Sequence, residues 1–371
     1  NTLKELGRLD EAEVSYKRAI TLKPELAEGY NNLGVTLQEL GRLDEAVASL
    51  QQAIMLKPDY AEAMLNLSIS LSYTNDLKTE MRTLKNSLQI DSGYYGLKAR
   101  VNLAICNFLD GNFLESKKHI LAATKIQEIT SSECRAEKAY QRYLLNILKW
   151  CEDNYFDDYN QQLDKTLYVI GESHSLASHY LRVQRSESDL LCKAKLIKGC
   201  KQWHLGNSSK NKYKNKFESI FCSLPKSSEV LLAIGEIDCR LDSGIIKHKN
   251  KFPEKKVKEI IATTIENFLT YIVKNNSDCQ HNIIIQGIPC PNIGTEACSE
   301  KEVMQLIEVI KNFNCELKNK SKEKGFEFLD VYKLTDRGDG VSNAIWHIDN
   351  IHLSPDGMQE AWRRYAAEQS C

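Results

Sequence analysis

The chain has 371 residues, of which 42% are hydrophobic and 27% are charged. This ordinary globular composition excludes a collagen-like, rod-like or wholly disordered protein. The 49 Lys and Arg residues balance 50 Asp and Glu residues, for a formal net charge of −1, which argues against a nucleic-acid-binding protein. No apolar stretch approaches the ~20 residues of a membrane span, and the length favours two domains.

The first third of the chain contains an internal repeat. Residues 6–12, with the sequence LGRLDEA, return verbatim at 40–46, a shift of 34 residues. The same shift carries Lys23 and Pro24 onto Lys57 and Pro58. A 34-residue period is typical of two-helix units that are too thin to bury an apolar face alone and therefore stack into a solenoid.

Each unit has a turn residue where its first helix ends. Gly7 and Gly41 hold this position in the first two copies, Asn75 in a degraded third copy and Gly111 in a fourth. A closing helix is expected at 136–150. These features resemble the tetratricopeptide repeat (TPR) family and define a first domain at 1–158.

The TPR resemblance implies a surface for a protein or peptide partner on the concave face of the solenoid. A packed spacer with no ligand is the alternative. The chain begins partway along a helix of this array, so we expect further repeats upstream.

Beyond an acidic, Asn- and Gln-rich junction at 152–164, the periodicity changes to alternating strands and helices. Amphipathic helices are expected at 254–273 and 302–318. This alternation predicts a parallel sheet covered by helices on both faces, with ligands at the carboxyl ends of the strands. Short apolar runs predict strands at 167–170, 194–197, 230–234, 282–286 and 326–331.

Three polar clusters follow strands or lie near the C-terminus: GESHS at 171–175, GEIDCR at 235–240 and DNIHLSPDG at 349–357. Together they resemble the blocks of the SGNH/GDSL hydrolase family, with Glu in place of Asp before the serine. The resemblance covers a second domain, 164–371. It implies a flavodoxin-like three-layer α/β/α sandwich, so the whole chain is expected to combine an α and an α/β fold.

The first and third clusters supply the residue types of a serine hydrolase. A serine hydroxyl needs a neutral imidazole to take its proton, and the imidazole needs a carboxylate to fix its tautomer. Ser173, His352 and Asp349 fill these roles in that order. The Asp and His are three residues apart, so both can face the serine from one turn. Alternatively, Ser173 caps a helix and His352 is an ordinary loop residue.

The resemblance also implies donors for the oxyanion of the reaction: the Ser173 backbone N–H, the glycine of a second block, assigned to Gly199, and a side chain of the GEIDCR block. The family has Asn where this chain has Ile237. Either Arg240 replaces that donor, or Asp238 is neutral or turned away and holds Arg240.

Other roles remain open for the charged residues of these blocks. Glu236 with Arg240 forms either a structural ion pair or a substrate clamp. His347, Asp349 and His352 could ligate a metal, but no fourth ligand is evident nearby. The proposed chemistry needs neither a metal nor an organic cofactor. Two lysine runs, at 210–216 and 247–258, are typical of solvated faces and do not indicate nucleic-acid binding.

The sequence therefore predicts a serine esterase or acyltransferase acting on O-acyl groups, with acetyl on a carbohydrate as the expected substrate and a TPR array that recruits a partner. The alternative is a scaffold whose α/β domain has lost catalysis and only binds glycans. The 12 cysteines contain no C-x-x-C pair. Scattered cysteines are typical of a reducing compartment, so a cytoplasmic location is expected.

Overall fold

The computed structural model describes residues 8–127, 135–155, 165–185, 188–293 and 299–369. By its contacts the chain divides into two compact units, Asn1–Leu148 with Ser209–Ile220, and Lys149–Ser208 with Phe221–Cys371. Most of the expected junction lies outside the described residues, so the domain boundaries at 158 and 164 stay predictions.

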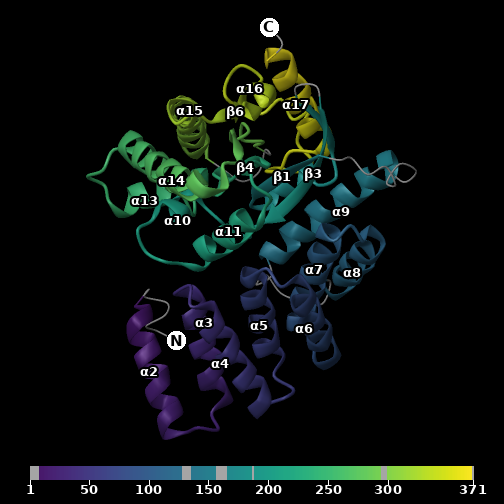
Figure 1. Ribbon diagram of the computed structural model, residues 1–371, viewed down its shortest axis with the longest axis vertical. Helices are drawn as coiled ribbons and strands as arrows, with labels where there is room; N and C mark the ends of the chain where they lie inside the picture. Colours follow the sequence, from purple (N-terminus) through teal and green to yellow (C-terminus); the bar gives the residue numbers. More distant parts are fainter. Residues whose placement is uncertain (1–7, 128–134, 156–164, 186–187, 294–298, 370–371) are drawn as a thin grey trace. The chain divides into compact units, whose positions relative to one another are not determined.

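The first unit is a series of antiparallel helix pairs (Figure 1). The helices α2 and α4 end just before the Lys-Pro dipeptides, as the repeat predicts, because proline disfavours helical backbone in the residue before it. The helices are α2 (Leu9–Leu22), α3 (Ala27–Glu39), α4 (Leu43–Leu56), α5 (Ala61–Thr74), α6 (Leu77–Ile90), α7 (Tyr94–Leu109) and α8 (Phe113–Gln127), followed by α9 (Arg135–Tyr155).

The turn residues of successive repeats share one backbone conformation. Gly41, Asn75 and Gly111 have φ values of 77°, 65° and 82°, in the left-handed region that favours glycine and tolerates asparagine. The first copy's Gly7 lies outside the described residues. The degraded third copy therefore keeps the geometry of the repeat with a different residue.

Within a repeat, the two helices approach closely at Gly34 of α3. A Cβ added to Gly34 would lie 2.5 Å from Cγ of Leu50 on α4, and the Leu50 side chain is fully buried. The close crossing thus depends on the absence of a side chain at Gly34.

Residues Ser209–Ile220, which include most of α11 (Lys212–Ser223), belong to the helical unit. The Lys212 ammonium donates to the Glu39 carboxylate at 2.6 Å, and the Lys216 ammonium donates to Oδ1 of Asn75 at 3.1 Å. The chain itself thus contacts the turn side of two successive repeats through a segment that is distant in sequence.

We expect Gly34→Ala to lower the stability of the helical unit by about 1–3 kcal/mol, because the new methyl group overlaps Leu50. Urea unfolding followed by far-UV circular dichroism measures this change. Gln51→Ala, at an exposed position on α4, is the control and should be nearly neutral. Equal midpoints for both variants would contradict the close-packed crossing.

The second unit contains a six-stranded mixed sheet with the strand order β2-β3-β1-β4-β5-β6. Five of these strands, in the spatial order β3, β1, β4, β5 and β6, pair in parallel with their neighbours. Each of the five strands predicted from the sequence overlaps one of them. The strands are β1 (Thr166–Gly171), β2 (Arg182–Arg185), β3 (Ser188–Leu196), β4 (Glu229–Ala233), β5 (Asn282–Gln286) and β6 (Glu327–Leu329).

The sheet is parallel as expected except at one edge. The strand β2 pairs antiparallel with β3, and the sequence analysis missed it. Its four residues, RVQR, carry a single apolar side chain, Val183. A short polar edge strand has almost no hydrophobic pattern to detect, since only one face of it meets the core.

Helices cover both sides of this sheet (Figure 1). Leu167 and Val169 of β1 share a buried cluster with Trp362 of α17, whereas α14 and α15 lie on the opposite side and bury Phe268 and Phe313. The helices are η2 (Ser173–Ser178), α10 (Gln202–Gly206), α12 (Glu236–Cys239), α13 (Ile245–Lys251), α14 (Val257–Cys279), α15 (Glu300–Glu323), α16 (Val331–Thr335) and α17 (Pro355–Gln369).

None of the described helices combines the length and the apolar composition that crossing a bilayer requires. The described cysteines are free thiols, and most of them are buried.

Candidate active site

The serine of the first polar cluster lies at the carboxyl end of β1. The strand ends at Gly171, and the short helix η2 starts at Ser173. A Cβ on Gly171 would lie 2.3 Å from the Ala233 carbonyl oxygen of β4, so glycine lets the two strands approach closely here. The first amides of η2 have no acceptor inside their own helix, which leaves the Ser173 N–H available to a ligand.

Asp349, His352 and Ser173 form a continuous line of contacts. Oδ2 of Asp349 lies 2.8 Å from Nδ1 of His352, and Nε2 of His352 lies 2.9 Å from Oγ of Ser173. The His352 and Ser173 side chains are buried. Residues 179 positions apart in sequence thus become neighbours, as the sequence analysis expected.

The loop fixes the Asp349 carboxylate as well as the imidazole. Oδ1 of Asp349 accepts from the backbone N–H groups of Ile351 and His352 at 2.8 and 2.6 Å. Burial raises the pKa of Asp349, but its hydrogen bonds to His352 outweigh this and hold the pKa near 2. An ionised carboxylate can only accept, so Nδ1 of His352 carries the proton and Nε2 is free to accept from Ser173.

A buried ion pair lies beside both the serine and His352. Oε1 of Glu172 lies 2.6 Å from Nδ1 of His174, and both side chains are almost fully buried. Burial opposes both charges, yet the mutual attraction lowers the pKa of Glu172 to about 2 and raises that of His174 to about 9. The sequence analysis gave neither residue a role; their proximity to Ser173 along the chain was the only local signal.

Ser173 lies between two acceptors for its one hydroxyl hydrogen. Its Oγ is 2.6 Å from Oε2 of Glu172 and 2.9 Å from Nε2 of His352. The single hydroxyl hydrogen can be donated to only one of these acceptors at a time.

The GEIDCR block adds a second ion pair beside the first. Arg240 donates from Nε and Nη2 to the Glu236 carboxylate, the closest contact being 2.6 Å. The electrostatic attraction of Glu236 raises the pKa of His174, and that of Glu172 raises the pKa of Arg240. Glu172, His174, Glu236 and Arg240 therefore alternate in charge next to Ser173.

Asp238 is turned toward a neighbouring helix. It is buried, and its carboxylate accepts from the backbone N–H groups of Gln202 and Trp203 at 2.7 and 3.2 Å, at the start of α10. Burial raises the pKa of Asp238 to about 7, even though these hydrogen bonds act to lower it. Arg240 is bonded to Glu236 and not to Asp238, so Asp238 holds α10.

Gly199 lies in the turn that leads from β3 to α10. Its φ of 69° is in the left-handed region, and Cys200 donates from its backbone to Ile197 across the turn at 3.1 Å. Within the described ranges, neither Gly199 nor Asp238 is hydrogen-bonded to Ser173. Their assignment to the oxyanion site stays a prediction.

One group of side chains in the described part of the chain offers the geometry of a metal site. Ligand atoms of Glu172, His174 and Glu236 lie within 4.8 Å of one another. His174 and Arg240 already bond these two carboxylates, so a cation would have to displace them. The trio considered from the sequence, His347, Asp349 and His352, does not form such a group among the described residues.

Comparisons with known proteins support the interpretation of the helical unit. The TPR repeat family matches residues 1–41, and the tetratricopeptide repeat family matches residues 27–60. The N-terminal region therefore consists of tetratricopeptide repeats, which indicate a protein-binding module. A comparison with curated proteins gave no match.

Three solved structures are among those similar to parts of this chain. MamA is 16% identical over 41% of this chain and 83% of its own, with a TM-score of 0.36. A thermophilic TPR protein from Thermus thermophilus is 19% identical over 39% and 76%, with a TM-score of 0.33. An extracellular lipase from Streptomyces rimosus is 14% identical over 56% and 100%, with a TM-score of 0.36.

The buried ion pair predicts a pH dependence of stability. The pKa of His174 is about 9 in the folded chain against an ordinary 6.5, so its stabilisation is complete below pH 6.5 and is lost as the pH rises through 9. We expect the fall in melting temperature between pH 6.5 and 9 to be smaller in His174→Gln than in the wild type.

The matched control is His248→Gln. Burial lowers the pKa of His248, so the titration of this histidine causes no loss of stability between pH 6.5 and 9. Thermal melts at half-unit pH steps measure the effect. An unchanged fall in His174→Gln would show that the pair does not carry this pH dependence.

Proposed function

We propose that the second unit is a serine-dependent esterase or acyltransferase of the SGNH/GDSL type, acting on O-acyl groups and in particular on O-acetyl groups of a carbohydrate. The observation that carries the proposal is the line of contacts from Asp349 through His352 to Ser173, with successive distances of 2.8 and 2.9 Å. This is the arrangement that activates a serine hydroxyl for attack on an ester.

The topology of the sheet supports a flavodoxin-like α/β/α sandwich. Numbered in chain order, the five parallel strands lie in the order 2-1-3-4-5, which is the flavodoxin order. The strand order reverses at β1 and β4, and ligands of such sheets bind at the carboxyl ends of the strands at this switch point. Ser173 follows β1 and the GEIDCR block follows β4, so both lie at this position.

The proposed mechanism has two acyl transfers. Oγ of Ser173 attacks the ester carbonyl while Nε2 of His352 takes the hydroxyl proton, and the resulting imidazolium is stabilised by Asp349. The tetrahedral intermediate collapses, the His352 proton passes to the departing alcohol, and an acyl-serine remains. Water or a sugar hydroxyl then gives its proton to His352 and attacks the acyl-serine. As the second tetrahedral intermediate collapses, His352 returns the proton to Oγ of Ser173, and the acyl group leaves as the free acid or as the new ester.

The oxyanion needs donors already in position. The Ser173 N–H at the start of η2 is the first, and Gly199 is the second by resemblance. Arg240 is the side chain of the GEIDCR block that can replace the missing Asn. Its guanidinium has five N–H donors, and Glu236 engages only two of its nitrogens.

A second candidate function is a TPR scaffold whose α/β unit binds glycans without catalysis. Two observations favour it: Ile237 stands where the family's Asn donor is expected, and Glu172 holds the Ser173 hydroxyl at 2.6 Å. In either case, we propose that the concave face of the TPR array binds a protein or peptide partner.

We expect Ser173→Ala to lower the hydrolysis of p-nitrophenyl acetate by about 10³-fold or more and to abolish labelling by a fluorophosphonate probe, because the nucleophile is lost. Ser175→Ala is the matched control. Ser175 is also buried, but its hydroxyl donates to the Glu172 carbonyl oxygen at 2.8 Å. Equal background rates for the wild type and Ser173→Ala would favour the scaffold.

We expect Asp349→Asn to lower kcat by about 10⁴-fold, since an amide no longer enforces the proton on Nδ1 of His352. The backbone contacts of the loop should survive, because the amide oxygen can still accept from Ile351 and His352. Steady-state kinetics with a melting curve separate the two effects. A variant with nearly wild-type kcat would remove Asp349 from the mechanism.

A further inference from the structure

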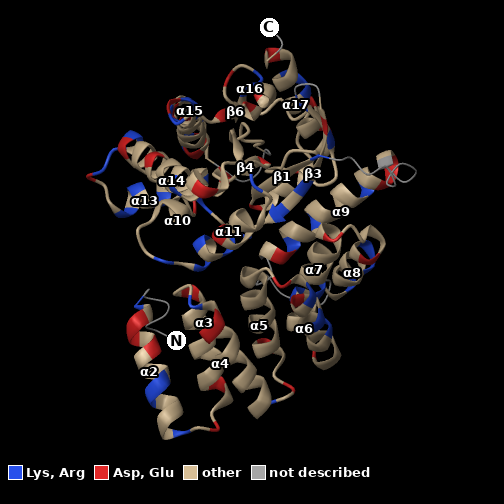
Figure 2. Ribbon diagram, viewed as in Figure 1, with Lys and Arg blue, Asp and Glu red and all other residues tan. Residues whose placement is uncertain are grey.

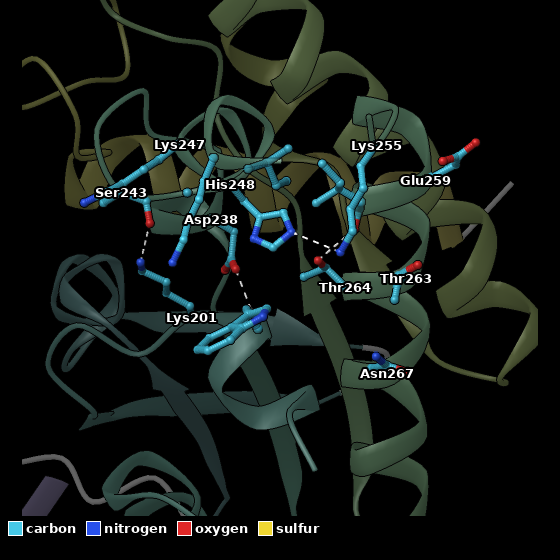
Figure 3. A pocket seen from close by; sticks show the side chains of 15 residues that line it. Lys201, Asp238, Ser243, Lys247, His248, Lys255, Glu259, Thr263, Thr264 and Asn267 are labelled. Atoms are coloured by element: carbon cyan, nitrogen blue, oxygen red, sulfur yellow. Dashed lines mark hydrogen bonds between the residues drawn. The ribbon is translucent and has the colours of Figure 1, made fainter. Parts of the chain in front are cut away.

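A cavity of about 620 Å³ opens in the second unit between α10, α13 and α14 (Figure 3). Its walls come from four stretches: the start of α10, Asp238 of α12, residues 243–251 with α13, and residues 255–267 at the start of α14. Neither the line of contacts at Ser173 nor the TPR array includes this cavity.

The cavity is lined by an excess of cationic groups. Lys201, Lys247, Lys251 and Lys255 all line it, together with His248. In the described part of the chain, none of these four lysines forms a salt bridge with a carboxylate. Figure 2 shows lysines along α13 and the segment that leads into α14.

The two carboxylates of the lining are already engaged. Asp238 accepts from the first amides of α10, and Glu259 accepts from the backbone N–H of Lys256 at 3.4 Å. The Lys201 ammonium donates to the Ser243 carbonyl oxygen, a neutral partner. Asp238 attracts Lys201 electrostatically, but the four lysines of the lining outnumber its two carboxylates.

A neutral histidine lies among these lysines and can accept a hydrogen bond from one of them. Nζ of Lys255 lies 3.5 Å from Nε2 of His248, and Figure 3 shows the two side by side. Burial lowers the pKa of His248, and Lys255 and Lys251 lower it further. The lysines lower the pKa of His248 because their positive charge disfavours its protonation, and the same charge would attract an anionic ligand.

The remaining lining suits a sugar. The Trp203 side chain is 51% exposed, although its backbone is anchored by Asp238. An exposed indole at the wall of a cavity offers an apolar face for a pyranose ring. Ser243, Thr263, Thr264 and Asn267 also line the cavity and offer hydroxyl and amide groups to sugar hydroxyls.

One segment connects this cavity to the candidate active site. Glu236 and Arg240 lie beside Glu172 and His174, while Asp238, between them in sequence, lines the cavity. A ligand held in the cavity therefore contacts the same short loop that borders Ser173.

We propose that this cavity is a binding site for an acidic carbohydrate, with the carboxylate or phosphate groups held by Lys201, Lys247 and Lys255 and a sugar ring packed on Trp203. The proposal that the cavity binds acidic carbohydrates does not depend on whether the protein hydrolyses esters. The further proposal that acidic glycans are the enzyme's substrates rests on the proposed function.

Isothermal titration calorimetry on the full chain carrying Ser173→Ala tests the site without turnover. The probes are hexagalacturonate and a hyaluronan hexasaccharide for carboxylates, and glucose 6-phosphate for phosphate. Maltohexaose is the neutral probe, and a thymidine hexanucleotide is a polyanion without a pyranose ring. We expect at least one acidic sugar to bind, and both maltohexaose and the oligonucleotide to bind at least tenfold more weakly.

Variants locate the binding. Lys247→Ala with Lys255→Ala, and separately Trp203→Ala, should each weaken acidic-sugar binding at least tenfold. Lys258→Ala removes an exposed lysine of α14 outside the cavity and should change it less than twofold. Melting curves establish that each variant is folded.

Absence of binding by every acidic sugar at millimolar concentration would overturn the proposal, as would equal binding of the oligonucleotide or an equal effect of Lys258→Ala. If acidic sugars bind but the wild-type protein hydrolyses no ester, the binding site stands and only the proposed function is contradicted.

Discussion

The candidate site depends on one contact between the two ends of the α/β unit, that of the His352 imidazole with the Ser173 hydroxyl. Each partner is positioned by a different kind of structure. The close approach of β1 and β4 at Gly171 fixes the serine, whereas the hydrogen bonds of Asp349 to its own loop fix the histidine. The end of β1 thus supplies the serine of the site, and a loop held by hydrogen bonds to the carboxylate of Asp349 supplies the histidine.

The charged side chains of the two ion pairs around this contact are arranged so that each carboxylate lies next to a positively charged group. A single buried carboxylate beside a serine would be costly, because burial penalises the charged form. The Glu172–His174 pair removes that cost, and Glu236 and Arg240 extend the alternation of charge. The consequence for chemistry is that Glu172 remains ionised and competes with His352 for the serine proton.

Asp238 connects the candidate site with the cationic cavity. In the sequence it stands within the block that borders the serine, and resemblance suggested a role at the oxyanion. In the structure its carboxylate holds the start of α10, where Trp203 and Lys201 lie. A residue of the GEIDCR block thereby positions part of the cavity wall, which physically connects the cavity with the segment that borders Ser173.

The sequence by itself determined the features that repeat or alternate locally. The 34-residue period placed the helix pairs and their left-handed turns, even at Asn75, and the apolar runs placed the five parallel strands. The spacing of Asp349 and His352 anticipated their contact, because three residues fit within one turn.

Only the tertiary structure decided the pairing of β2, the direction of the Asp238 carboxylate, the ion pair beside Ser173 and the contacts of residues Ser209–Ile220 with the repeats. The physical reason is that a periodic pattern is a property of neighbouring residues in the sequence. The compensation of a buried charge depends instead on which distant groups the fold brings within a few ångströms.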